Sequence, residues 1–134
     1  MPLLIPFLLA SAVVQGEADL HRVVSLLDYV GADYALAVQG GVVVNALEYE
    51  EQGVFLADAG RLIVRADGST EDKGTALAGL GVLSRAVANR EPSTSVAALS
   101  RSLREEIVVR WGLVLRPPAD LGEDGREEGR ALFV

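Results

Sequence analysis

The 134-residue sequence contains no cysteine and only one histidine, His21. Without cysteine the chain can form no disulfide, no thiolate metal site and no covalent haem attachment. Aromatic residues make up only 5% of the chain, so we expect a core built mainly from Leu, Val and Ala. No apolar run reaches the roughly 20 residues that a membrane-spanning helix needs. Because phosphate-loop, hydrolase-elbow and zinc signatures are also missing, the sequence gives no indication of an enzyme.

Basic residues are missing from one long segment, residues 28–58, which holds six carboxylates and no lysine or arginine. The net charge of the chain is −7, so the acidity is concentrated in this segment. A local acidic field attracts cations and basic partners, and it repels nucleic acid and anionic lipid. The segment therefore predicts a cation or a basic protein as the ligand, and no nucleic acid. Its carboxylates are Asp28, Asp33, Glu48, Glu50, Glu51 and Asp58, and its aromatic residues are Tyr29, Tyr34, Tyr49 and Phe55.

The N-terminus carries a short apolar run, Leu3 to Leu9, followed by Ala10-Ser11-Ala12. This order is typical of a signal peptide, with small residues at the cleavage site. We therefore expect residues 1–12 to be removed, a mature chain from Val13, and a periplasmic or other extracytoplasmic location. The alternative is an apolar segment that packs on the rest of the fold, because Pro6 interrupts the run and no basic residue precedes it.

Apolar residues recur at spacings of three and four along four stretches, which is the pattern of amphipathic helices. Asp19 is expected at the start of the first helix, and Asn45 with Glu48 forms a capping-box pattern at the start of the second. Gly112 follows the last helix, where a left-handed residue often ends such an element. The run Val42 to Val44 is expected to be a packed loop, because a lone strand would have no partner. The expected helices cover about 18–39, 46–66, 75–89 and 93–111.

Four helices joined by short turns predict an all-α fold, an antiparallel four-helix bundle. We expect the bundle to occupy residues 13–112. Residues 113–134 are expected to form a C-terminal linker, opened by Arg116-Pro117-Pro118, and then the start of another helix near Arg130.

Two carboxylates of the second helix, Glu51 and Asp58, are in register with Leu47, Val54 and Leu62. This spacing predicts that both lie on or beside the buried stripe. A carboxylate there is costly unless it is paired or binds a metal ion. The alternative is that both lie at the rim of the bundle and pair with arginines.

Asp28, Asp33, Glu48 and Glu51 are the candidate metal ligands, since iron and calcium accept hard oxygen donors. The Glu-x-x-His element of di-iron bundles is missing. The alternative is a solvated acidic face, in which Tyr29, Tyr34, Tyr49 and Glu50 would contact a protein partner.

The pattern from residue 26 to residue 55 resembles the extracytoplasmic N-terminal region of bacterial high-affinity iron permeases, the oxidase-dependent iron transporter family. In that family a similar segment precedes the membrane domain, often with a c-type cytochrome module between them. The end of this chain, with Gly129, Leu132 and Phe133, is similar to the lead-in to a class I cytochrome c. The residues that carry the first resemblance are Leu26-Leu27-Asp28-Tyr29-Val30-Gly31-Ala32-Asp33-Tyr34, Ala37-Val38, Gly41-Val42, Glu48-Tyr49-Glu50-Glu51 and Phe55.

The resemblance implies a non-enzymatic accessory domain in iron uptake, with the membrane domain of an iron permease or a c-type cytochrome as partner. An iron ion would bind the acidic, tyrosine-rich face, no haem would be attached to this chain, and membrane association would occur only through the partner. The alternative is a docking or spacer module without a metal of its own. The chain lacks the permease's membrane helices and Arg-Glu-x-x-Glu motif, so transport itself is not assigned to it.

Overall fold

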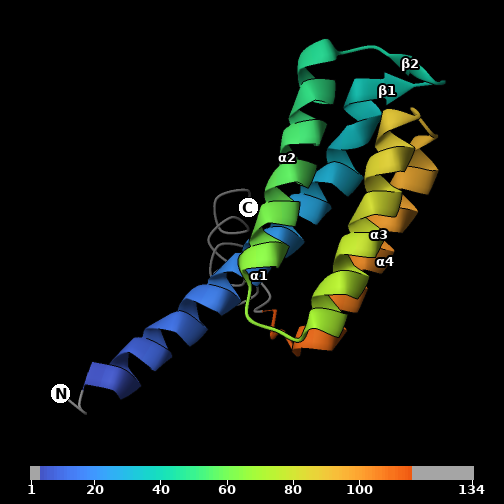
Figure 1. Cartoon of the computed structure of the whole chain (residues 1–134). Helices are drawn as coiled ribbons and strands as arrows, with labels where there is room; N and C mark the ends of the chain where they lie inside the picture. Colours follow the sequence, from blue (N-terminus) through green and yellow to red (C-terminus); the bar gives the residue numbers. More distant parts are fainter. Residues whose placement is uncertain (1–3, 116–134) are drawn as a thin grey trace, which may run out of the picture.

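The chain folds into four helices and one short hairpin, as seen in a computed structural model that describes residues 4–115, with side chains described for 16–115 (Figure 1). Helix α1 packs on α2 and α4, and α3 packs on the same two helices, so the four surround one core. This arrangement confirms the predicted four-helix bundle. The elements are α1 (Leu4–Ala37), β1 (Val38–Gln39), β2 (Val42–Val43), α2 (Ala46–Arg65), α3 (Thr70–Ala88) and α4 (Ser93–Trp111).

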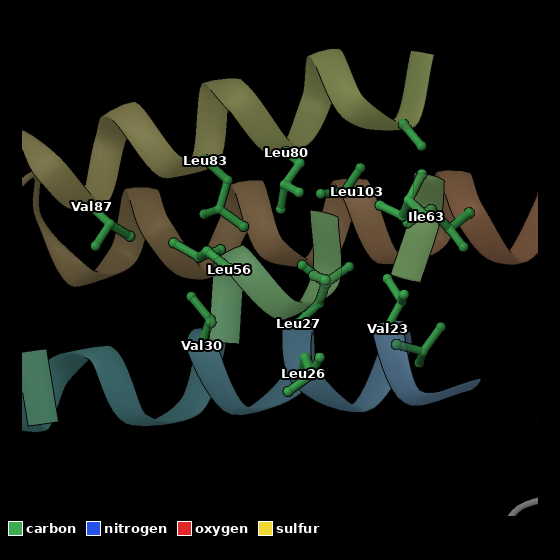
Figure 2. Packing of buried hydrophobic residues seen from close by; sticks show 14 of the residues in the cluster. Val23, Leu26, Leu27, Val30, Leu56, Ile63, Leu80, Leu83, Val87 and Leu103 are labelled. Carbon is green, nitrogen blue, oxygen red and sulfur yellow. The ribbon is translucent and has the colours of Figure 1, made fainter. Parts of the chain in front are cut away.

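The core consists almost entirely of Leu, Val, Ile and Ala, as the scarcity of aromatic residues predicted. Figure 2 shows side chains from all four helices meeting in the shared interior, among them Leu27 of α1, Leu56 of α2, Leu83 of α3 and Leu103 of α4. Tyr34 is the one fully buried aromatic side chain among the described residues.

Helix α1 begins at Leu4, and the expected start near residues 18 and 19 is wrong. Asp19 therefore lies inside the helix, where it caps no helix end. The residue is 6% exposed, and its carboxylate accepts two hydrogen bonds from Arg65 of α2, from Nε at 3.0 Å and from Nη2 at 2.8 Å. The helix runs through the expected cleavage site after residue 12, and its N-terminal part extends beyond the other helices (Figure 1). Removal of residues 1–12 stays a prediction.

The expected loop at Val42 to Val44 is also wrong, because Val42–Val43 forms a strand. It pairs with β1, which directly follows α1, in an antiparallel hairpin, Val38 with Val43 and Gln39 with Val42. Gly40 and Gly41 form the turn with φ of +57° and +76°. Two consecutive residues with positive φ are what a two-residue type I′ hairpin turn needs, and glycine adopts them without strain.

The starts of α2 and α3 depend on side-chain caps. Asn45 Oδ1 accepts a hydrogen bond from the backbone N–H of Glu48 at 3.1 Å, as the capping pattern predicted. Ser69 Oγ accepts one from the N–H of Asp72 at 3.0 Å. Because this cap satisfies a free donor of the first turn, α3 starts at Thr70, five residues before the expected start. Gly112 ends α4 with φ of 60°, as predicted.

Both ends of the bundle are tied by hydrogen bonds between residues far apart in sequence. At the hairpin end, Tyr34 Oη donates to the carbonyl of Glu91 at 2.6 Å and Tyr49 Oη donates to the carbonyl of Val87 at 2.9 Å. At the other end, Trp111 Nε1 donates to the carbonyl of Asp67 at 2.7 Å. These bonds fix α1 and α2 against the pair α3 and α4.

Within residues 4–115, no helix combines the length and the apolar character that crossing a membrane requires. The predicted cytochrome-like segment, and the linker from residue 116 on, lie outside the described residues.

Candidate functional site

Helix α2 presents a different face to the core than its sequence indicated. Leu47 and Val54 are 79% and 50% exposed, so the stripe that they form with Glu51 and Asp58 faces solvent. Glu51 and Asp58 therefore do not lie on the buried stripe, and for Asp58 the alternative expectation, a rim carboxylate paired with an arginine, is confirmed. Asp58 lies at the rim and forms an ion pair with Arg61, and Glu51 is exposed. The residues of α2 that are buried are Gln52, Leu56, Ala59, Leu62 and Ile63.

The groove between α1 and α2 places two of the candidate ligands opposite each other. The rings of Tyr29 and Phe55 meet across this groove, with centroids 5.8 Å apart. From this contact, one helical turn toward the hairpin leads to Asp33 on α1 and to Glu51 on α2. Both carboxylates therefore lie at the same level, on opposite sides of the groove. Glu48 follows about one turn closer to the hairpin.

Asp28, the fourth candidate, lies elsewhere on α1. It is five residues from Asp33, which corresponds to about 140° around a helix with 3.6 residues per turn. Arg104 of α4 forms an ion pair with Asp28, with its Nε 2.7 Å from Oδ1, so Asp28 belongs to the groove between α1 and α4. In that groove the helices approach closely, since a Cβ on Gly31 would lie 3.4 Å from Ser100 Cβ.

The four candidate ligands are thus divided between two grooves. Among the residues that the structure describes, no group of three or more His, Asp or Glu side chains is close enough to hold a metal ion. Asp33, Glu48 and Glu51 share one face, so a ligand of the acidic segment would bind on this face.

The three tyrosines differ in exposure. Tyr29 is exposed beside the groove, and Glu50 is exposed on α2. Tyr34 is fully buried, and its pKa is raised above 10.0 mainly by burial and also by the nearby Tyr49 and Glu91. Tyr49 is partly buried, with its hydroxyl bound to the α3 end. A partner on this face would meet Tyr29 and Glu50, while Tyr34 and Tyr49 hold the bundle together.

Arginines lie at the end of the same groove away from the hairpin, and two of them, Arg61 and Arg65, are on α2, where arginine partners for rim carboxylates were expected. A hollow of about 420 Å³ is lined by Arg22 of α1 and by Asp58, Arg61, Leu62 and Arg65 of α2. The hydrogen bonds to Asp19 raise the pKa of Arg65 and fix its guanidinium in place. Asp19 and Arg65 are 46 positions apart, so no local pattern could have predicted this pair.

Gln52 is a second feature that the sequence did not reveal. Its side chain is fully buried on the core face of α2, and neither amide atom has a hydrogen-bond partner among the described residues. A glutamine between Glu51 and Gly53 gives no sign of burial, since glutamine is mostly exposed in proteins.

Taken as a class, the molecule is a four-helix-bundle domain that concentrates carboxylates at its hairpin end. A family model described as the iron permease-associated 4-helix bundle domain matches residues 11–108, and the chain belongs to this family. The resemblance seen over residues 26–55 is thereby confirmed, and an accessory role in iron uptake follows from it. Neither the curated proteins nor the solved structures contain a match to the chain.

Proposed function

We propose that this domain works outside the cytoplasm beside an iron permease, where its acidic face binds iron ions loosely and raises their local concentration. One observation carries the proposal: Asp33 and Glu51 lie opposite each other across the α1–α2 groove, near Glu48, in a segment without lysine or arginine. Carboxylate oxygens are suitable ligands for iron ions. Exposed carboxylates attract cations electrostatically and exchange them rapidly, which suits a domain that passes an ion to a transporter.

A titration of the full chain with ferrous iron under anaerobic conditions tests this proposal, with calcium as the competing cation. We expect saturable iron binding that weakens as salt concentration rises, because exposed charges are screened over about 8–10 Å at moderate ionic strength. The variant D33N/E48Q/E51Q should lose this binding. A control variant, E17Q/E71Q/E105Q, removes the same number of charges elsewhere and should retain it.

Asp28 needs a separate variant, because it lies in the groove between α1 and α4 and pairs with Arg104. D28N should change iron affinity less than E51Q does. Equal iron binding by the wild-type chain and by D33N/E48Q/E51Q would contradict the proposal.

A second candidate function is docking of a protein partner without a metal ion. The observation that favours it is the exposure of large apolar side chains on the same face: Tyr29, Leu36, Leu47 and Val54 are all at least 50% exposed. Apolar residues gathered on a surface often mark an interaction site. The partner would be a basic surface of the permease membrane domain or of a c-type cytochrome. L47S/V54S should then abolish association with that partner and leave iron binding unchanged.

A further inference from the structure

The outer face of α1 and α2 has two oppositely charged halves. The Tyr29–Phe55 ring contact lies near its middle. The acidic half extends from there toward the hairpin and holds Asp33, Glu48 and Glu51. The arginine half extends the other way and holds Arg22, Arg61 and Arg65, around the hollow that also contains Asp58. Within one copy, Arg61 pairs with Asp58 and Arg65 pairs with Asp19.

Apolar side chains occupy the middle and the hairpin end of this face. Tyr29 and Val54 lie near the middle, and Leu36 and Leu47 lie near the hairpin; all four are at least 50% exposed. Helices α3 and α4 cover the opposite side of the α1–α2 pair. Within residues 16–115, whose side chains are described, these four apolar side chains therefore remain open to solvent.

The positions of the opposite charges share one centre. On α2, the midpoint between Glu51 and Arg61 falls at Leu56, and the midpoint between Glu48 and Arg65 falls between Leu56 and Ala57. On α1, the midpoint between Asp33 and Arg22 falls between Leu27 and Asp28. Because Tyr29 and Phe55 are in contact and the two helices run in opposite directions, the midpoint on α1 lies at the level of Leu56 and Ala57 on α2. Three pairs of opposite charge are thus arranged symmetrically about a single line perpendicular to the helices.

We infer that the occupant of this face is a second copy of the chain, bound in a two-fold symmetric dimer. A two-fold interface brings the same patch of both copies together. If one residue contacts a second residue of the other copy, the second residue of the first copy makes the same contact in return. With the axis along that line, α1 lies antiparallel to α1 of the other copy and α2 lies antiparallel to α2. Glu51 then faces Arg61 of the second copy, Asp33 faces Arg22, and each contact occurs twice.

A foreign basic helix fits this face less well, because it matches only the acidic half; in the arginine half the carboxylates Asp58 and Asp19 are already paired with Arg61 and Arg65. The second copy satisfies both halves and covers Tyr29 and Val54 near the middle of the face. The dimer uses Asp33 and Glu51, the carboxylates proposed to bind iron, so an iron ion and the second copy compete for them. Association is therefore measured in the presence of a chelator, and a failed iron titration leaves the dimer standing.

Sedimentation equilibrium of the full chain over a range of concentrations tests the dimer. We expect reversible association that weakens as salt is added, because charge pairs at the rim are screened. E51R and R61E should each weaken dimerisation by roughly tenfold or more, since two symmetry-related contacts become repulsive. E71R makes the same charge change on α3, away from the face, and should leave dimerisation unchanged.

The decisive variant is E51R/R61E, which exchanges the two charges and should restore dimerisation close to the wild-type level. Within one copy the two positions are ten residues apart, roughly 15 Å along the helix axis, so restoration requires a contact between copies. A wild-type chain that stays monomeric at all concentrations overturns the inference, and so does a double variant as weak as the two single ones. A monomer that binds a basic amphipathic peptide through Leu47 and Val54 would assign the face to a foreign partner instead.

Discussion

At the scale of single residues, Gln52 is the least satisfied side chain of the described core. Its amide is fully buried and has no hydrogen-bond partner among the described residues. A buried polar group without a partner costs about 1–3 kcal/mol, and replacing it by an apolar group of similar shape removes that cost. Methionine has nearly the length and volume of glutamine, so we expect Q52M to raise the free energy of unfolding by about 1 kcal/mol or more.

Urea denaturation of Q52M measures this gain as a shift of the midpoint at constant slope. Q39M serves as the control, because Gln39 is exposed on the hairpin, and its stability should stay close to that of the wild type. A loss of stability in Q52M would show that the amide is hydrogen-bonded in solution.

Because of Tyr34, we expect the free energy of unfolding to fall at alkaline pH. Burial, with Tyr49 and Glu91 nearby, raises its pKa in the folded state above 10.0. As pH rises past 10.0, the unfolded chain releases this proton before the folded chain does, so the folded state binds more protons and its stability falls. The stability that Tyr34 contributes is therefore complete below its ordinary pKa and is lost as pH rises through the raised value.

The measurement compares unfolding free energies between neutral and strongly alkaline pH for the wild type, Y34F and Y29F. Y34F should show a smaller alkaline loss than the wild type. It should also be less stable at neutral pH, by about 1 kcal/mol, because the hydrogen bond to the carbonyl of Glu91 is lost. Y29F removes an exposed hydroxyl and should follow the wild-type profile; an equal alkaline loss in Y34F would contradict the assignment.

At the scale of elements, two glycines of α3 have different surroundings although they are two residues apart. A Cβ on Gly79 would lie 2.9 Å from Leu103 Cδ1 of α4, and a Cβ on Gly81 would have nothing within 4 Å. Alanine is favoured over glycine by about 1 kcal/mol inside a helix, so G81A should stabilise the domain by about that amount. In G79A the buried Leu103 must move, and we expect it to be at least about 1 kcal/mol less stable than G81A.

Thermal unfolding of the two variants in parallel checks this difference, since they share the same helix and the same chemical change. Equal stabilisation by both substitutions would show that α3 and α4 can separate slightly without cost. Nothing in the sequence distinguishes the two glycines, and the structure shows close contact with α4 for Gly79 only.

The elements also show what local patterns can predict. The stripes of α1 and α4, with spacings of three and four, correctly identify the core faces around Val23, Leu27 and Ile107. On α2 two stripes of that spacing compete, and the one that lies in the core contains Gln52, so counting apolar residues favoured the other. The hairpin was missed because its first strand, Val38–Gln39, continues directly from a helix.

At the scale of the whole molecule, the fold and the family could be predicted from the sequence, since helix periodicity and the pattern over residues 26–55 are local. The outline of the candidate site was only partly predictable. Asp33 and Glu51 face the same groove, while Asp28 pairs with Arg104 and Tyr34 is buried. These contacts join residues that are far apart in the chain, so they could not be predicted from a single sequence.

The unequal packing of the helices predicts how the domain opens. Helix α1 makes the most extensive contacts of the four, with α2 and α4, and its central side chains Val23, Leu27 and Val30 are at most 1% exposed. Backbone amides exchange with solvent only when their hydrogen bonds open, and well-packed segments open only on global unfolding. Amides from Val23 to Val30 should therefore show the slowest hydrogen exchange, with an opening free energy equal to the unfolding free energy from urea. Amides of the hairpin, where Val42 is exposed, should exchange faster by local opening. If the slowest amides lie in α3 instead, the pair α3 and α4 would be the stable unit, and the long α1 would pack on it afterwards.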